Sequence, residues 1–258
     1  MMSSGKVVAI RLALIATILA IWEISTGGWV SGTDYLDVYF SSPIKIFAAL
    51  IENWDLLLSD TIVTVTEAFI GLVGGIVSGV VIAILFGQFE TLDRIVEPVF
   101  QGLNAIPRPA LAPLLIIWFG LGMISKVLVA WSIVFFIVFY NVYSGIKSID
   151  PDYFRTMKVL GASDRQMVRI IVAPAIMSWV FAAFRVSVAY SLLGAVVGEF
   201  AGATEGLGYR LIISEGMLAT DLLYGIILIM MIIGYSVSAG AKRLENRLLR
   251  WRPTAVAI

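Results

Sequence analysis

Residues 61–86 read TIVTVTEAFIGLVGGIVSGVVIAILF and contain a single charged side chain, that of Glu67. The hydrocarbon core of a bilayer is about 30 Å thick, and about 20 mostly apolar helical residues are needed to cross it. This stretch is long enough and apolar enough to do so. It therefore predicts a transmembrane helix.

Other stretches of the chain pass the same test. They are residues 7–25, 127–146, 173–197 and 222–241, and residues 95–119 pass it with an interruption. The first has Arg11 and Glu23 near its ends, where long side chains can reach the membrane surface. No clear small-residue cleavage site follows it, so we expect a retained helix rather than a signal peptide. The stretches predict an all-α membrane protein with about six transmembrane helices.

Composition agrees with this prediction and weakens most enzyme hypotheses. The 258 residues are 60% hydrophobic and 14% charged, with a mean hydropathy of +0.96. Soluble domains are roughly 45–50% apolar and about 25% charged. The chain has no cysteine and no histidine, which excludes thiol chemistry and the commonest general base and metal ligand. We expect no metal, no cofactor and no catalytic residue in this chain.

Basic residues are distributed unevenly between the two sets of loops. With the N-terminus in the cytoplasm, the outer segments carry only Lys45, Lys126 and Arg210. The cytoplasmic segments carry Lys6, Arg11, Arg94, Lys147, Arg155, Lys158, Arg165, Arg169, Lys242, Arg243, Arg247, Arg250 and Arg252. Cytoplasmic loops of membrane proteins are enriched in Lys and Arg, so both termini are expected in the cytoplasm.

A short amphipathic helix is expected after the first span. Ser42 and Pro43 suit an N-cap and a first helical residue. Apolar residues then follow at helical spacing: Ile44, Phe47, Leu50, Ile51 and Trp54. That face either lies in the outer membrane surface or packs against other helices. We expect residues 1–57 to comprise the first span and this helix, and residues 58–250 to form the transmembrane core.

Small residues recur every fourth position in the second span, at Gly71, Gly75 and Gly79. Such a row lets two helices approach closely. It serves either a dimer contact or packing within one chain, and we favour the second. The fifth span has a similar row: Ala183, Ser187, Ser191 and Ala195, with Gly194 and Gly198 beside it.

The third span is interrupted by prolines. Residues 104–113 read NAIPRPALAP, and Pro107, Pro109 and Pro113 cannot donate backbone hydrogen bonds or continue a regular helix. The break is either a simple kink or a solute site, because irregular backbone at membrane depth lines cavities in transporters. Arg108 lies inside the break and favours the second interpretation, since an unneeded charge there costs roughly 2.5–3.5 kcal/mol or more.

The loop between the fourth and fifth spans predicts two helices with a turn between them. Residues 151–160 have a helical pattern, and Gly161 suits the left-handed residue that ends a helix. Ser163 and Gln166 then have the spacing of a capping box, which starts a second helix.

This loop resembles the signature of ABC-importer permeases, which is glutamate-alanine-alanine, three residues, glycine, nine residues, isoleucine, one residue and leucine-proline. Gly161, Ile171 and Pro174 have the required spacing. The loop departs from the signature at Arg155, Thr156 and Met157, in place of glutamate and two alanines, and at Ala173, in place of leucine. Further segments resemble the nitrate, sulfonate and taurine branch of these permeases. They are LNAIP (103–107), ALAPL (110–114), IWFGLG (117–122), SKV (125–127), GAS (161–163), GEF (198–200) and GLGY (206–209).

The resemblance, over about residues 42–252, implies a type I importer permease of the bacterial inner membrane. It implies a homodimer, two cytoplasmic ATPase subunits that use ATP and Mg²⁺, and an extracytoplasmic substrate-binding protein; no nucleic-acid partner is expected. It further implies that a short coupling helix docks on the ATPase. The residues carried over to that dock are Asp152, Tyr153, Phe154, Arg155, Lys158, Leu160, Gly161, Ala162 and Ser163. The chain has no G-x-x-x-x-G-K-[ST] sequence of its own.

The solute pathway is the less determined part of the site. Charged residues inside spans are functional candidates by default, but Arg185 could instead form a structural ion pair with Glu67. The pathway candidates are Pro107, Arg108, Pro109, Asn141, Tyr143, Arg185, Ser187, Ser191 and Glu199. The expected solute is small and carries an anionic group, or is a vitamin precursor.

Two rival functions are considered. One is a secondary transporter or channel that needs no ATP, but the inverted repeat common in such folds is not evident here. The other is an intramembrane enzyme, for which the spans offer Glu67, Glu97 and Glu199 on separate helices without a catalytic spacing.

Overall fold

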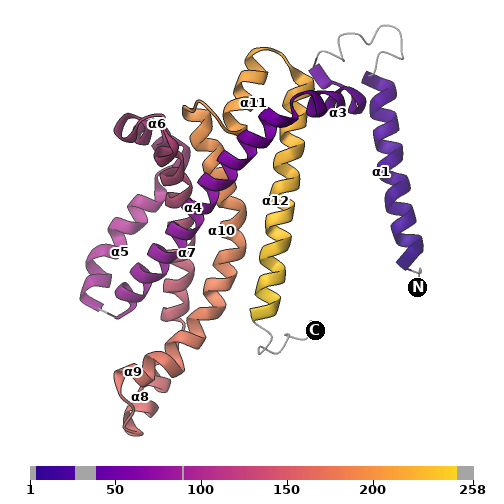
Figure 1. Ribbon diagram of the computed structural model, residues 1–258. Helices are drawn as coiled ribbons and strands as arrows, with labels where there is room; N and C mark the ends of the chain where they lie inside the picture. Colours follow the sequence, from indigo (N-terminus) through magenta and orange to yellow (C-terminus); the bar gives the residue numbers. More distant parts are fainter. Residues whose placement is uncertain (1–3, 27–38, 89, 249–258) are drawn as a thin grey trace.

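The computed structural model describes residues 4–26, 39–88 and 90–248, and every element in these ranges is helical (Figure 1). In chain order the helices are α1 (Ser4–Thr26), α3 (Pro43–Glu52), α4 (Trp54–Gln88), α5 (Glu90–Ala105), α6 (Arg108–Phe119), α7 (Met123–Lys147), α8 (Pro151–Val159), α9 (Asp164–Met167), a π-helix (Val168–Val172), α10 (Ala173–Ala201), α11 (Leu207–Gly216) and α12 (Thr220–Leu248). In the described ranges, five helices are long and apolar enough to cross a membrane, and the bent pair α5–α6 would make a sixth. The prediction of an all-α membrane protein with about six spans is confirmed.

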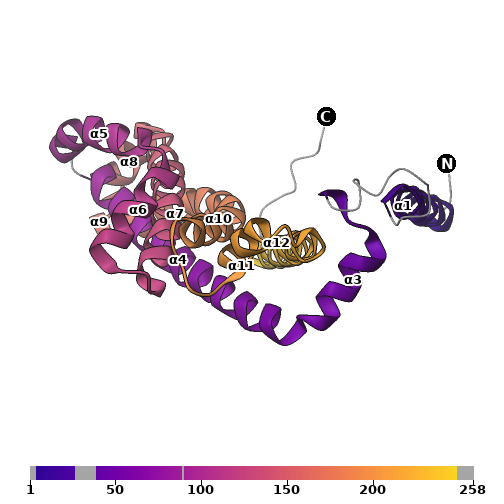
Figure 2. The same ribbon diagram turned by 90° about the horizontal axis from the view of Figure 1, so that it is seen from above.

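α7 lies at the centre of the bundle, packed between α4 and α10 (Figure 2). Val134, Val138 and Val142 on α7 are completely buried. Most of the other spans expose apolar side chains, as expected where lipid is the solvent. The main core of the protein is therefore the contact surface of α7 with α4 and α10.

The glycine row of α4 faces α7. A Cβ atom added at Gly71 would lie 2.6 Å from the Ala130 Cβ, and one added at Gly75 would lie 2.6 Å from the Val134 Cβ. Both distances are too short for carbon atoms in contact, so only glycine permits this separation of the helices. The interpretation that the row serves packing within the chain is confirmed.

α10 approaches α7 in the same way. A Cβ added at Gly194 would lie 2.6 Å from the Ala130 Cα, and one at Gly198 would lie 2.9 Å from the Lys126 Cα. Small residues on both neighbours thus allow both backbones to approach α7.

Several transmembrane helices are longer than the apolar stretches from which they were predicted. α4 begins at Trp54 rather than at residue 61, so the expected boundary between residues 57 and 58 lies inside this helix. Leu57, only 1% exposed, packs with Leu207 and Ile226, and this contact fixes the extra turns. The outer limits of the two expected parts, residues 1 and 250, lie outside the described ranges.

The third span is broken, as predicted. α5 and α6 meet at an angle of 92°, and Pro107 at the junction has the extended backbone of an N-cap, with φ −60° and ψ 118°. Pro109 lies in the first turn of α6, where an absent N–H costs nothing. The expectation that Pro113 also interrupts the helix is wrong, because α6 continues through it. A proline removes one helical hydrogen bond, and membrane helices tolerate that loss.

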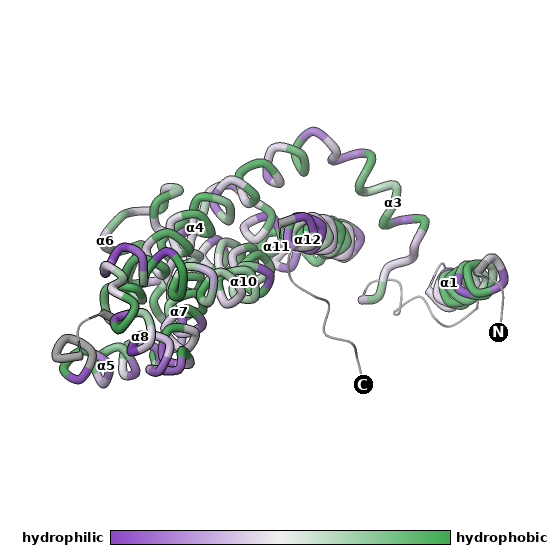
Figure 3. The backbone as a smooth tube through the Cα atoms, turned by 90° about the horizontal axis from the view of Figure 1, so that it is seen from below, coloured by the Kyte–Doolittle hydropathy of each residue, from purple (hydrophilic) through white to green (hydrophobic). Residues whose placement is uncertain are grey.

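The start of α1, the end of α12 and the loop between α7 and α10 lie at one end of the molecule. In Figure 1 the start of α1, the end of α12 and helices α8 and α9 are all at the lower end, while α3 and α11 are at the upper end. Seen from below in Figure 3, hydrophilic colour gathers on α8 and hydrophobic colour predominates on α4. This arrangement agrees with an even number of membrane crossings.

The predicted short helix is present as α3, and part of it packs against another helix. Ser42 caps its start, as predicted, and its side chain accepts a hydrogen bond from the Lys45 N–H. Ile46 is buried against α12, close to Gly225. Phe47 and Ile51 point outwards and are more than half exposed. One apolar face thus packs within the protein, and the other is available to lipid.

Candidate functional site

The loop between α7 and α10 is built from local backbone signals. Asp150 caps the start of α8, where its carboxylate accepts a hydrogen bond from the Asp152 N–H at 2.9 Å. At the other end, the Gly161 N–H donates to the Lys158 carbonyl and the Ala162 N–H donates to the Met157 carbonyl, both at 3.0 Å. These two bonds are a Schellman motif. Its left-handed residue is Gly161, with φ +76°, as predicted.

The next helix begins at once. The Ser163 side chain accepts a hydrogen bond from the Gln166 N–H, and the Gln166 side chain accepts one from the Ser163 N–H. The predicted capping box is confirmed. Because the end of α8 and the start of α9 are both closed by hydrogen bonds, the turn between them has a defined geometry.

α8 presents its side chains to the surroundings rather than to the bundle. None of its residues is buried, and Tyr153, Val159 and Leu160 are 64%, 88% and 74% exposed. A groove of about 740 Å³, lined in part by Tyr153, Met157 and Ile170, separates α8 from the start of the fifth span. Exposed apolar side chains on a helix that stands apart from its own protein are typical of a docking surface.

A π-helix connects this loop to the fifth span. The Ala173 N–H donates to the carbonyl of Val168, five residues earlier. Pro174 follows at once, and a proline ring would clash with the carbonyl four residues before it in an α-helix. The wider turn relieves that clash. π-turns are frequent at functional positions, and this one lies where α8 and α9 join the membrane core.

Arg108 lies at the bend of the third span and closes the end of α5. Its Nη1 donates to the Leu103 carbonyl at 3.1 Å, and its Nη2 donates to the carbonyl and side-chain oxygens of Asn104 at 3.2 and 3.0 Å. The guanidinium carbon also lies 4.3 Å from the centre of the Phe136 ring, which is a cation–π contact. In the described ranges, no carboxylate forms an ion pair with Arg108.

A cavity of about 560 Å³ opens beside Arg108. It is lined by α5, α6, α7 and α10 through Asn104, Arg108, Ile133, Phe136, Ile137, Tyr140, Asn141, Val186 and Tyr190. Two pathway candidates, Arg108 and Asn141, thus come together, and Pro107 and Pro109 form the adjoining bend. Asn104, Phe136, Tyr140 and Tyr190 were not predicted. Their residue types gave little signal, because aromatic side chains at helical spacing fill the core of most membrane bundles.

The other pathway candidates lie away from this cavity. Tyr143 is one turn further along α7, stacked on Phe139 with 5.6 Å between the ring centres. Ser187 and Ser191 are buried among the packed helices. Arg185 forms an ion pair with Glu245 of α12, with 2.5 Å between Nη2 and Oε1. The proposed ion pair with Glu67 is therefore wrong; sequence spacing could not reveal that α12 brings a carboxylate closer.

Glu199 belongs to a buried hydrogen-bond network at the α11 end of the bundle. It is 1% exposed and accepts hydrogen bonds from the Thr64 hydroxyl at 2.6 Å and from the Gly208 N–H. Asp60 joins the same region through an ion pair with Arg210 at 2.8 Å. The network ties α4, α10 and α11 together.

Lys126 and Glu67 lie beside this network. Lys126 is 2% exposed, and its Nζ donates to the backbone carbonyls of Leu121 and Gly122. The Oε2 atom of Glu67 is buried without a hydrogen-bond partner among the described residues. In the described ranges there is no group of three metal-ligating side chains.

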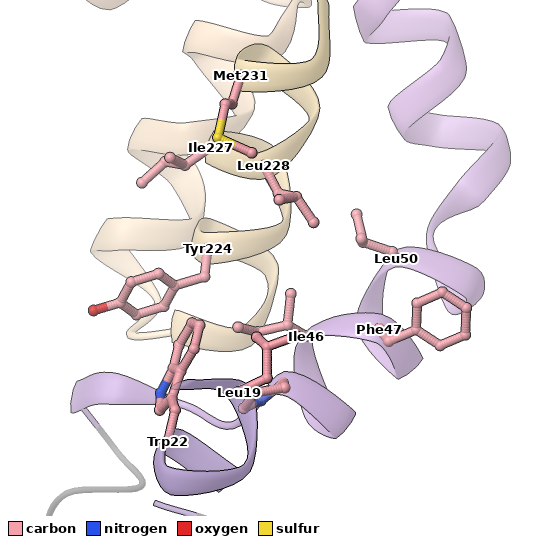
Figure 4. Close-up of a pocket in the computed structure, with 10 residues that line it drawn as sticks. Leu19, Trp22, Ile46, Phe47, Leu50, Tyr224, Ile227, Leu228 and Met231 are labelled. Atoms are coloured by element: carbon pink, nitrogen blue, oxygen red, sulfur yellow. The ribbon is translucent and has the colours of Figure 1, made fainter. Parts of the chain in front are cut away.

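A second groove differs in chemistry from the cavity at Arg108. It has a volume of about 310 Å³ and lies between α1, α3 and α12, where Trp22, Ile46, Leu50, Tyr224 and Met231 contribute to its wall (Figure 4). Its lining contains no charged side chain. Such a surface suits lipid rather than a polar solute.

Comparisons with known proteins agree with these features. The family model described as "Binding-protein-dependent transport system inner membrane component" matches residues 71–250. The formylaminopyrimidine transport permease protein ThiX of Halalkalibacterium halodurans is 34% identical over 239 residues, which cover 91% of this chain and 92% of that protein. The taurine transport system permease protein TauC of Escherichia coli is 28% identical over 188 residues, covering 73% of this chain and 68% of that protein.

The fold is shared with solved transporters. A chain of the MetNI methionine ABC transporter, in an inward-facing conformation, superposes with a TM-score of 0.64 at 18% identity, covering 73% of this chain and 94% of that chain. The resemblance carried by the loop around Gly161 is therefore confirmed over most of the sequence. The chain belongs to the binding-protein-dependent transport system inner membrane component family and is a transmembrane permease subunit of an ABC importer.

Proposed function

We propose that two copies of this chain form the pathway of an importer that separate ATPase subunits drive and a substrate-binding protein supplies. The observation that carries this proposal is the exposed helix α8. Its two ends are closed by hydrogen bonds, no side chain on it is buried, and Tyr153 and Val159 are 64% and 88% exposed. A helix in this state is suited to insert into a groove of another protein.

The docking surface comprises α8 and the turn that follows. Its residues are Asp152, Tyr153, Phe154, Arg155, Lys158, Leu160, Gly161, Ala162 and Ser163. A force on α8 would pass through the hydrogen-bonded turn to α9 and then through the π-helix to α10, which packs on the central helix α7. The loop would thus connect closure of the ATPase to movement of the core.

Arg155 is the distinctive residue of this surface. Glutamate stands at its position in the family signature, whereas here a guanidinium forms an exposed ion pair with Asp152 at 2.8 Å. We infer that the partner ATPase carries an acidic group opposite Arg155. Reversal of the charge should then repel the ATPase, because like charges in contact are unfavourable.

The solute is small and is delivered from the side opposite α8. Relatives are named for formylaminopyrimidine and for taurine, and a sulfonate, nitrate or vitamin precursor would fit the same branch. The pathway would include Arg108 and Asn141 at the cavity and Pro107 and Pro109 at the adjoining bend. Its further candidates are residues of α7 and α10, namely Tyr143, Arg185, Ser187, Ser191 and Glu199. Both termini would be cytoplasmic, in the bacterial inner membrane.

The test is reconstitution of the chain in liposomes with the ATPase and the binding protein of the same organism that co-purify with it. ATP hydrolysis should rise when the loaded binding protein is added, and Arg155→Glu should abolish that rise. The matched control is Arg247→Glu, which reverses an exposed charge at the cytoplasmic end of α12 and should leave stimulation unchanged. Solute uptake by the chain alone, without any ATPase, would instead establish a secondary transporter.

A further inference from the structure

The charge of Arg108 is uncompensated within the described part of the chain. Arg185, the other arginine proposed for the pathway, is neutralised by Glu245 at 2.5 Å. Arg108 has only carbonyl and amide oxygens and the face of Phe136 around it. Charged side chains within membrane spans are generally paired or face a water-filled cavity. A cavity is present here, so the missing counter-charge can come from a solute.

The cavity also contains hydrogen-bond donors that the protein does not use. A guanidinium has five N–H groups, and the three bonds from Arg108 come from Nη1 and Nη2, none from Nε. The hydroxyl of Tyr140, a residue of the cavity wall, is buried and has no hydrogen-bond partner among the described residues. Unused donors next to a cation favour the oxygens of a carboxylate or sulfonate. Among the described residues, Arg108 is the one cationic side chain in the lining of the cavity, so the site is suited to a solute with a single negative charge.

The remaining wall is apolar and largely aromatic. Phe136 and Tyr140 stack one turn apart on α7, with 6.3 Å between ring centres and an interplanar angle of 27°. Tyr190 faces the same space from α10 and is 45% exposed, while Ile133 and Val186 complete the apolar wall. Ring faces of this kind favour stacked or edge-on contact with another ring.

We propose that this cavity is a solute site that selects aromatic monoanions, with Arg108 binding the anionic group and Tyr140 and Tyr190 contacting the ring. This proposal rests on the proposed function, since it assigns the solute that passes through the permease. It makes the permease itself a contributor to specificity. Arg108 is then a binding residue as well as the cap of α5.

Binding is measured on the full-length chain in nanodiscs by saturation-transfer difference NMR, with empty nanodiscs as the background. The probe is benzenesulfonate, and the competitors are methanesulfonate, which lacks the ring, and benzyl alcohol, which lacks the charge. We expect benzenesulfonate to bind about tenfold more tightly than either, the difference expected from one lost contact worth about 1.4 kcal/mol. Equal binding of methanesulfonate would overturn the ring contact, and equal binding of benzyl alcohol would overturn the role of Arg108.

Variants of Arg108 and Tyr190 test whether these side chains bind the probe, and a conservative variant distinguishes lost binding from failure to fold. Arg108→Gln should weaken benzenesulfonate binding about tenfold, and Tyr190→Leu should weaken it while methanesulfonate binding stays unchanged. Arg108→Lys retains the charge and should retain part of the affinity, which keeps the test valid if Arg108→Gln does not fold. The controls Arg165→Gln and Tyr235→Leu remove a charge and a ring elsewhere and should bind as the unmodified chain does.

Unchanged binding in both Arg108→Gln and Tyr190→Leu contradicts the proposal. That result leaves the importer function intact, because stimulation of ATP hydrolysis by the loaded binding protein is measured independently. If the loaded binding protein did not stimulate ATP hydrolysis with the unmodified chain, that result would contradict the proposed function instead.

Discussion

Glu199 is a residue whose role follows from its contacts rather than from its charge. Its two carboxylate oxygens accept hydrogen bonds from the Thr64 hydroxyl of α4 and from the Gly208 N–H of α11. All of these groups are buried, so no water can replace a lost acceptor without rearrangement. A buried donor without an acceptor costs about 1–3 kcal/mol.

We therefore expect Glu199→Ala to lower the unfolding temperature of the purified chain in detergent. For a chain of this size, 1 kcal/mol corresponds to about 2–4 °C. The Gly208 N–H loses its acceptor in this variant, whereas the Thr64 hydroxyl can still donate to the Asp60 carbonyl at 3.1 Å, so the unfolding temperature should fall by a few degrees. Glu199→Gln retains one acceptor oxygen, so its unfolding temperature should lie between those of the unmodified chain and Glu199→Ala. The control is Glu215→Ala, at an exposed carboxylate of α11, which should change little. Equal unfolding temperatures for the two alanine variants would show that the network does not stabilise the bundle.

At the residue scale, local signals could be predicted and distant partners could not. Ser42, Gly161 and Ser163 act through atoms within four positions of themselves, so their roles depend only on the adjacent sequence. The partner of Arg185 was assigned wrongly because Glu245 is distant in the chain and becomes a neighbour only when α12 packs on α10. Tyr190 was missed for the same reason.

At the element scale, the contact between α4 and α7 depends on glycine. Gly75→Ala would place a methyl group 2.6 Å from the Val134 Cβ. Alanine favours a helix over glycine by up to about 1 kcal/mol, so propensity alone predicts stabilisation. We expect the steric clash to outweigh that gain, because overpacking typically costs about 1–3 kcal/mol, and the unfolding temperature should fall.

The matched control is Gly240→Ala in α12, where an added Cβ meets no atom within 4 Å. That variant should be unchanged or slightly more stable. If Gly75→Ala were equally stable, the two helices would have room to separate, and the close approach would not be essential to the core.

The proline pattern of the third span predicts where the helix is interrupted, but not the angle between the two resulting helices. Three prolines predicted an interrupted third span, and the junction at Pro107 is where the bend occurs. The 92° angle depends on how α6 packs on α7 and α10, which no local sequence pattern records. α11 was not predicted either, because it is too short to span a membrane and its stability comes from burial of Leu207.

At the scale of the whole molecule, the topology predicted from Lys and Arg has a direct structural counterpart. The start of α1, the end of α12 and helix α8 share one end of the molecule, and α11 lies at the other (Figure 1). If α8 binds an ATPase, that end must face the cytoplasm. The orientation of the entire chain thus depends on which side of the membrane α8 occupies.

The absence of native cysteine makes this orientation measurable, because a single introduced thiol is the only target for a maleimide. Val159→Cys on α8 and Met217→Cys at the end of α11 are suitable, since the native side chains are 88% and 74% exposed. A membrane-impermeant maleimide applied to intact spheroplasts should label Met217→Cys and leave Val159→Cys unlabelled. After permeabilisation both should react, which shows that Val159→Cys was protected by the membrane and not by the fold. The reverse pattern would place α8 outside the cell, where no ATPase could reach it, and would contradict the coupling role of this loop together with the predicted topology.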